Sequence, residues 1–143
     1  MEHEQDKNAT FFRFEDLRIY HKSLEYTDFI FSSSKNSGND PIVISFFERL
    51  LSSAQNVSLN IAEGSSRNKS QFVYYLKMAK SSVRECVVLT TIALAHNIMS
   101  KENYDHSKNQ LMEMTKMLGA LIGSLQRSVK PGEKEDEEED DTI

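Results

Sequence analysis

The chain has 143 residues, of which 38% are hydrophobic, and it contains 5 glycines, 2 prolines and 1 cysteine. This length suits one domain with a buried core, and so few turn-forming residues exclude a protein built from many short strands. The single cysteine, Cys86, excludes an internal disulfide and a zinc site of paired cysteines. Since the longest uncharged stretch, residues 86–100, is shorter than the ~20 apolar residues of a membrane span, we expect a cytoplasmic protein that does not enter the membrane.

The net charge of −5 conceals an uneven distribution along the chain. Residues 131–143 hold eight acidic residues against one lysine, whereas the rest of the chain has a net charge of +2. A block of like charge with few apolar residues cannot bury enough surface to become ordered. We therefore predict a flexible leader over residues 1–13, a folded domain over residues 14–129 and a disordered acidic tail over residues 130–143.

The first predicted helix runs from about Glu15 to Ser34, with Asp16 as a possible N-cap. Leu17, Leu24 and Phe31 recur every seven residues, with Tyr20, His21 and residues 27–30 filling the gaps, so we expect these residues on the buried face. Residues 35–39 have the composition of a turn.

The second predicted helix starts at Asp40-Pro41, where the carboxylate is a typical N-cap and proline suits the first helical position. It ends at Gly64, which we expect to adopt the left-handed conformation that commonly follows a helix. Its buried stripe is predicted to contain Val43, Phe46, Phe47, Leu50, Ala54, Val57 and Ile61.

Two further helices follow, each with a cap signal at its start. Asn68 and Gln71 have the spacing of a capping box, and Ser100 is a typical N-cap. Gly119 and Gly123, four residues apart in the last helix, predict the close approach of another helix from this chain or from a neighbouring subunit. Four helices and short turns predict an all-α fold, an antiparallel up-down-up-down four-helix bundle. The predicted core positions of these two helices are Phe72, Tyr75, Leu76, Ala79, Val83, Cys86, Leu89, Ala93, Tyr104, Leu111, Met114, Leu118, Leu121 and Leu125.

Residues 65–84 contain five basic residues and no acidic residue, and they are the candidate nucleic-acid-binding residues: Arg67, Lys69, Lys77, Lys80 and Arg84. Lys77, Lys80 and Arg84 fall on one helical face, which could neutralise phosphates. Tyr74 beside them could stack on an exposed base. The alternative is an ordinary solvated helix surface. Likewise, the acidic tail either only adds solubility or folds over the basic residues as a phosphate mimic.

Other polar residues are better explained by structure than by chemistry. We expect Asn60, Glu63, Gly64, Ser82 and Glu85 to be structural, with Glu63 near Arg67, Asn68 or Lys69. The alternative is a carboxylate pair for acid–base or metal chemistry, but the Glu-x-x-His pairs of bundle metal sites are absent. His96 and His106 flank one turn and could approach each other, but two imidazoles do not define a metal site. The sequence therefore predicts no enzyme, no metal and no cofactor.

Three segments resemble the four-helix bundle family of proteins encoded in intervening sequences of bacterial 23S rRNA genes, a family that is itself similar to the accessory protein of diversity-generating retroelements. The segments are residues 14–20 (FEDLRIY), residues 60–64 (NIAEG) and the pattern of Phe72, Leu76, Ala79, Ser82 and Glu85. The resemblance implies a ring-like homo-oligomer, a pentamer, without catalytic activity. It also implies association with RNA, DNA or a ribonucleoprotein partner such as a ribosome or a reverse transcriptase. The alternative is a protein–protein scaffold or adaptor that binds no nucleic acid.

Overall fold

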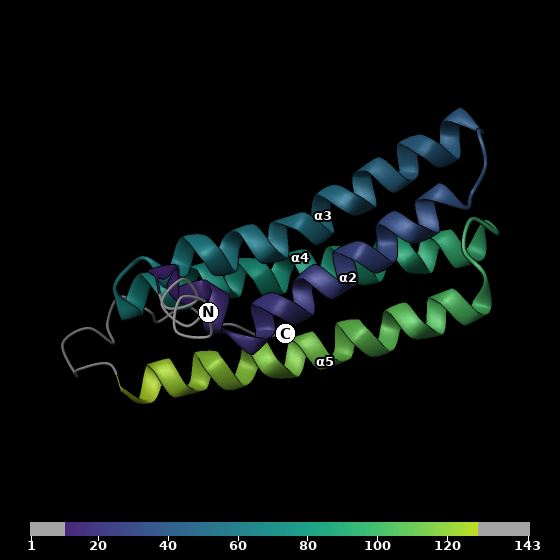
Figure 1. Cartoon of the computed structure of the whole chain (residues 1–143). Coiled ribbons are helices and arrows are strands. Elements are labelled where there is room, and N and C mark those ends of the chain that lie inside the picture. Colours follow the sequence, from purple (N-terminus) through teal and green to yellow (C-terminus); the bar gives the residue numbers. More distant parts are fainter. Residues whose placement is uncertain (1–10, 129–143) are drawn as a thin grey trace, which may run out of the picture.

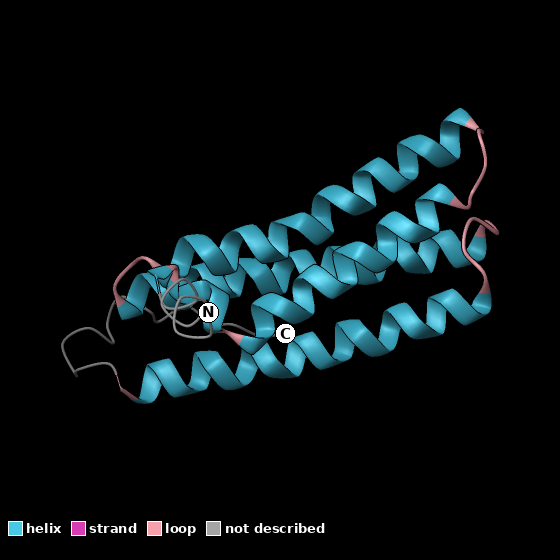
Figure 2. Cartoon of the chain, in the orientation of Figure 1, coloured by secondary structure: helices cyan, strands magenta, loops and turns pink. Residues whose placement is uncertain are grey.

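The computed structural model describes residues 11–128, and four long helices joined by short turns form a bundle (Figures 1 and 2). The elements are a 3-10 helix η1 (Arg13–Asp16) and the α-helices α2 (Arg18–Lys35), α3 (Pro41–Ser65), α4 (Lys69–Ala95) and α5 (Lys101–Arg127). Helix α3 packs between α2 and α4, while α5 packs on α4 and more lightly on α2. The predicted all-α up-down bundle is thus confirmed. The predicted acidic tail and the first ten residues of the predicted leader lie outside the described residues.

The N-caps of three helices are those that the sequence predicts. Asp40, Asn68 and Ser100 each accept a hydrogen bond from a backbone N–H in the first turn of α3, α4 and α5, at 2.9, 2.9 and 3.1 Å. Such bonds satisfy donors that a helix start leaves without a partner.

The start of the first helix differs from the prediction. Residues 13–16 form η1, and Leu17 then takes an extended backbone conformation as the N-cap of α2. Asp16, the predicted cap, lies in η1, and the N-cap of α2 makes no side-chain hydrogen bond. The extended residue separates the two helices, so the predicted single helix from Glu15 is wrong.

The predicted buried face of this helix is correct only in part: Thr27 and Ile30 are buried and Leu17 packs against the core, but several predicted positions are exposed. Leu24 and Phe31 are 38% and 41% exposed, whereas Ile19, Tyr26 and Ile30 are 3% exposed or less. Sequence periodicity missed Ser23 and Tyr26 because these polar side chains are buried with hydrogen-bond partners on other helices. The Tyr26 hydroxyl forms a hydrogen bond with Ser107 Oγ of α5 at 2.8 Å, and Ser23 Oγ forms one with Ser58 Oγ of α3 at 2.7 Å. Paired in this way, polar groups can occupy a core position.

The hydrophobic core runs between all four helices and confirms most of the apolar positions predicted on α3, α4 and α5. Cys86 lies fully buried in this core as a free thiol. Burial raises the pKa of the Cys86 thiol to about 12, so the thiol stays protonated at neutral pH. The other buried apolar residues are Ile19, Tyr26, Ile30, Phe47, Leu50, Ala54, Val57, Ile61, Val73, Leu76, Ala79, Val83, Ala93, Met99, Leu111, Met114, Leu118 and Ile122.

Gly64 serves packing rather than helix termination. Helix α3 continues through Gly64 to Ser65, so the predicted left-handed conformation at this position is wrong. A Cβ atom at Gly64 would lie 2.7 Å from Tyr75 Cβ and 2.9 Å from Phe72 Cδ1 of α4. Glycine is therefore needed because α3 and α4 approach closely here. The left-handed conformation occurs instead at Asn97 (φ 58), directly after α4.

The two glycines of α5 have no close neighbour on another described helix. A Cβ atom at Gly119 would meet nothing within 4 Å, and one at Gly123 would meet only Arg127 Nη1 of the same helix, at 3.3 Å. The prediction that another helix of this chain lies close to these two glycines is therefore wrong for residues 11–128. The alternative, a neighbouring subunit, stays a prediction.

None of the helices among residues 11–128 is both long and apolar enough to span a membrane.

Candidate nucleic-acid interface

The basic residues that the sequence places on one face of α4 differ in exposure. Arg84 is exposed and Lys77 is half-buried, whereas Lys80 is only 7% exposed. Long basic side chains often bury their aliphatic stems against apolar neighbours. The outer surface of α4 therefore presents Lys77 and Arg84, and Lys80 is mainly part of the packed bundle.

A third basic residue joins this surface from α3. Arg49 and Arg84 line one shallow hollow on the outside of the bundle, together with Ser81, Glu85, Val88 and Leu89. Arg84 Nη2 donates a hydrogen bond to Ser81 Oγ at 3.2 Å. We call Arg49, Lys77 and Arg84 the basic surface. Sequence reasoning missed Arg49 because the two arginines are far apart in the chain, and only the register of α3 against α4 brings them together.

That register is marked by a hydrogen bond between the helices. Ser53 Oγ of α3 donates to Glu85 Oε1 of α4 at 2.9 Å. Since Arg49 lies one helical turn before Ser53, it falls beside the residues around Glu85. Glu85 thus accepts a hydrogen bond that links α3 to α4. It also places one carboxylate at the edge of the basic surface.

The other motif residues are also placed by packing. Ser82 is buried at 7% exposure, and Gly64 lies where α3 and α4 approach most closely. Asn60 Nδ2 donates to the Asn56 carbonyl within α3 at 2.8 Å. Asn60 therefore stabilises its own helix.

The remaining two basic candidates lie at the end of the bundle where α3 turns into α4. Arg67 Nε donates to Glu63 Oε2 at 3.0 Å, as the predicted proximity of these residues requires. This hydrogen bond raises the pKa of the Arg67 guanidinium, which also lies 5.3 Å from the ring centroid of Tyr75. Lys69 is exposed in the first turn of α4. Of the five candidates, Arg67, Lys69 and Arg84 are therefore exposed, Lys77 is half-buried and Lys80 is buried.

The described part of the chain provides no arrangement for metal chemistry. Residues 11–128 contain no group of three or more histidine, cysteine, aspartate and glutamate side chains that could hold a metal ion. Glu63 of α3 pairs with Arg67, whereas Glu85 of α4 accepts a hydrogen bond from Ser53 of α3. Ser53 lies about 15 Å before Glu63 along α3, so the two carboxylates do not face each other. His106 packs edge-to-face on Phe29, with ring centroids 4.7 Å apart.

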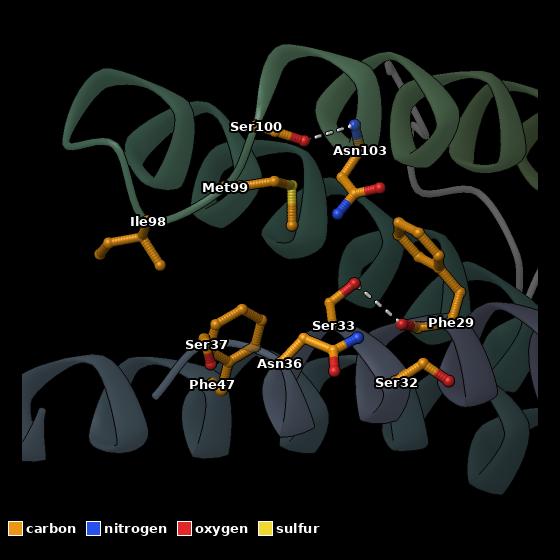
Figure 3. A pocket seen from close by; sticks show the side chains of 10 residues that line it. All are labelled: Phe29, Ser32, Ser33, Asn36, Ser37, Phe47, Ile98, Met99, Ser100 and Asn103. Carbon is orange, nitrogen blue, oxygen red and sulfur yellow. Dashed lines mark hydrogen bonds between the residues drawn. The ribbon is translucent and has the colours of Figure 1, made fainter. Parts of the chain in front are cut away.

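A second hollow lies at the end of the bundle opposite the turn between α3 and α4, and all of its lining residues are uncharged (Figure 3). Serine, asparagine and apolar side chains from the end of α2 and the turn between α4 and α5 surround it. Two of its polar groups already serve the helices, because Ser33 Oγ donates to the Phe29 carbonyl at 3.0 Å and Ser100 Oγ caps α5. This hollow therefore offers phosphate no charged partner. Its lining residues are Phe29, Ser32, Ser33, Asn36, Ser37, Phe47, Ile98, Met99, Ser100 and Asn103.

Comparison with known proteins identifies a family over most of the described bundle. No curated protein is significantly similar to the chain. The family model of the 23S rRNA-intervening sequence protein matches residues 15–120, which include α2, α3, α4 and most of α5. The match covers well over half of the chain and agrees with the four-helix fold. The protein thus belongs to the 23S rRNA-intervening sequence protein family.

Proposed function

We propose that this protein is a non-catalytic, oligomeric four-helix bundle that binds nucleic acid, alone or in a ribonucleoprotein such as a ribosome or a reverse transcriptase complex. The observation that carries the proposal is the pairing of Arg49 on α3 with Arg84 on α4 in one exposed hollow. Lys77 lies two turns before Arg84 on the same side of α4. Guanidinium groups bind phosphate oxygens in a bidentate manner, so two helices together could follow one phosphate backbone.

Binding of this kind would be electrostatic and largely independent of sequence. Neutralised phosphates release counterions, so affinity falls as salt rises. Tyr74, which is 58% exposed and close to the basic surface along α4, could add stacking on an unpaired base. Because duplex DNA offers no unpaired base for stacking, we expect the basic surface to bind structured RNA with unpaired bases more tightly than duplex DNA.

The first test reverses the charge of the basic surface. The Arg49→Glu, Lys77→Glu, Arg84→Glu triple variant should bind structured RNA at least ~10-fold more weakly in fluorescence anisotropy at about 50 mM salt. The salt slope should fall by about 0.7–0.9 for each phosphate that the variant no longer neutralises. Lys80 is left unchanged, because a carboxylate at this buried position would disturb folding.

The matched control carries charge reversals elsewhere on the bundle. Lys108→Glu with Lys116→Glu changes two exposed lysines of α5 and should reduce affinity far less than the triple variant. Circular dichroism of all variants checks that the helices remain folded. Equal affinity of the triple variant and the wild type would exclude the basic surface as the binding site.

An apolar row on the outside of α4 supports assembly into a homo-oligomer. Met78, Val88 and Ile92 are 42–58% exposed although they are large and apolar. Together with Ser81 and Glu85, these residues follow one another in alternating steps of three and four positions along α4. Residues in such steps lie on one side of a helix, and the same repeat occurs where two helices pack against each other. We therefore propose that subunits associate through this row. Because Ser81, Glu85 and Val88 also line the hollow between Arg49 and Arg84, the seam runs beside the basic surface and the two arginines flank it. The ring-like pentamer implied by the family resemblance is our proposed state.

Charged substitutions in the apolar row test the assembly. Met78→Glu with Val88→Glu should convert the wild-type oligomer into a species near the chain mass of 16.4 kDa, measured by analytical ultracentrifugation. The cause is the cost of burying two unpaired carboxylates in the interface. Met112→Glu, at a 50% exposed apolar position on α5, is the control and should leave the mass unchanged. A wild-type protein that is already monomeric would contradict the proposal.

The second candidate function is a protein–protein scaffold or adaptor without nucleic acid. The apolar row favours it, because contiguous exposed apolar side chains mark protein interfaces. In that case RNA and duplex DNA would fail to bind the wild-type chain even at low salt. The Met78→Glu, Val88→Glu variant would then fail to bind the partner protein, whereas the charge-reversed variant would still bind it.

A further inference from the structure

A groove at one end of the bundle collects basic side chains from three different elements. Arg13 of η1, Arg67 of the turn between α3 and α4, and Lys69 of α4 line it together with one carboxylate, Asp16. Leu125, near the C-terminal end of α5, lies on the same wall. Figure 1 shows that the last turns of α5 and the turn between α3 and α4 lie at the same end of the molecule. We call this site the end groove; its remaining lining residues are Leu17, Ser65, Asn68 and Phe72.

The charge of the end groove is only partly compensated within residues 11–128. Arg67 pairs with Glu63, whereas Arg13 and Lys69 have no carboxylate of the described chain within 4 Å. The positive end of the α4 dipole adds to the potential at Lys69, whereas the C-terminal ends of α3 and α5, near Ser65 and Leu125, lower it elsewhere in the groove. The end groove is therefore suited to an extended anionic chain.

The sequence supplies such a chain at a short distance. Residues 131–143, the acidic segment, have a net charge of −7 and follow α5, which ends at Arg127. Glu133, the first acidic residue, lies six positions after Arg127, and an extended chain of this length spans about 20 Å. Because Leu125 already lines the end groove, the first carboxylates can reach Lys69 without crossing the bundle. Tethering also gives the segment a local concentration in the millimolar range.

We infer that the acidic segment of the same chain binds in the end groove and competes with polyanions for the basic residues there. The docking follows from charge complementarity and tethering alone. Only the competition rests on the proposed binding of nucleic acid. Docked carboxylates beside Lys69 would repel phosphates approaching this end of α4, so RNA would be confined to the basic surface.

Zero-length cross-linking of the full chain tests the docking without nucleic acid. A water-soluble carbodiimide joins a lysine amine to a carboxylate that touches it, and mass spectrometry identifies the joined peptides. At low salt, Lys69 should couple to residues 133–141 with a yield at least several-fold above that of Lys116, an exposed lysine on α5. Coupling of Lys22 to Glu113, whose charged atoms lie 3.0 Å apart on α2 and α5, gives a different peptide and serves as an internal reference.

Two further arms identify the occupant and the residues that hold it. Arg13→Gln should lower the yield at Lys69, whereas Lys108→Gln should not. When isotope-labelled and unlabelled protein are mixed in equal amounts, most cross-links should join two labelled or two unlabelled peptides. Few should be hybrid products, in which a labelled peptide is joined to an unlabelled one. Equal yields at Lys69 and Lys116, or no effect of Arg13→Gln, would overturn the inference. Predominantly hybrid products would show that the segment of a second copy occupies the end groove, which also overturns it.

The competition has a separate readout. Replacing the eight acidic residues of the segment with glutamine or asparagine should tighten RNA binding several-fold at low salt. If cross-links form but neither protein binds RNA, the docking stands and the proposed function fails. If both proteins bind RNA equally and Lys69 gives no specific cross-link, the inference fails and the proposed function stands.

Discussion

Gly64→Ala is expected to lower the free energy of unfolding by about 1–3 kcal/mol, the usual cost of overpacking a filled core. The new Cβ atom would lie 2.7 Å from Tyr75 Cβ, an atom fixed to the backbone of α4, and 2.9 Å from a ring carbon of Phe72. No side-chain rotation relieves the first of these clashes, so α3 and α4 must move apart. Urea unfolding followed by circular dichroism measures the change.

Gly119→Ala is the matched control for this substitution. The same chemical change occurs inside α5, where a Cβ atom meets nothing within 4 Å. Alanine is the better helix former by about 1 kcal/mol, so the variant should be more stable than the wild type. Opposite signs at the two positions would show that close packing, and not helix propensity, explains Gly64. A stabilised Gly64→Ala variant would disprove the close approach of α3 and α4.

Leu118→Ala should lower the free energy of unfolding by about 2–5 kcal/mol. Leu118 is fully buried in α5, and truncation removes apolar packing and leaves a cavity that the surrounding helices fill only in part. Chemical denaturation of the wild type and the variant under identical conditions gives the difference. Because the bundle is proposed to be oligomeric, both proteins must be compared at one protein concentration.

Met112→Ala tests whether this destabilisation depends on burial. Met112 lies on the same helix as Leu118 but is 50% exposed, so its truncation should change stability by no more than about 0.5 kcal/mol. A destabilisation at Met112 equal to that at Leu118 would mean that this face of α5 is covered, most simply by another subunit.

The starts of α3, α4 and α5 were predictable from sequence because their signals are local. Asp40, Asn68 and Ser100 cap helices by bonding N–H groups only two or three residues away. The apolar stripes of α3, α4 and α5 were equally readable, since most of their buried positions are apolar. The family, too, was indicated by short motifs in the correct order, and the family model matches residues 15–120.

Part of the buried face of α2 was misread, because apolar periodicity does not register paired polar groups. Leu24 and Phe31 carry the stronger apolar signal, yet Tyr26 and Ser23 are buried. Their burial depends on Ser107 and Ser58, which lie on other helices. No pattern within α2 reveals that these partners exist.

The candidate site was predictable only in part for the same reason. The excess of basic residues between 65 and 84 is a property of the sequence, and it indicated α4. Whether each charge is available depends on packing: Lys80 is buried, and Arg67 is paired with Glu63. Arg49 joined the basic surface and Arg13 joined the end groove only when distant segments were placed side by side.

The sequence by itself determined the fold class, the N-caps of α3, α4 and α5, and the family, because these depend on local hydrogen bonds, periodicity and short motifs. The tertiary structure decided which face of α2 is buried, why residue 64 is glycine and which basic side chains share a surface. Each of these depends on the register of one helix against another. That register is set by hydrogen bonds such as Ser53–Glu85 and Tyr26–Ser107, whose partners lie 32 and 81 residues apart in the chain.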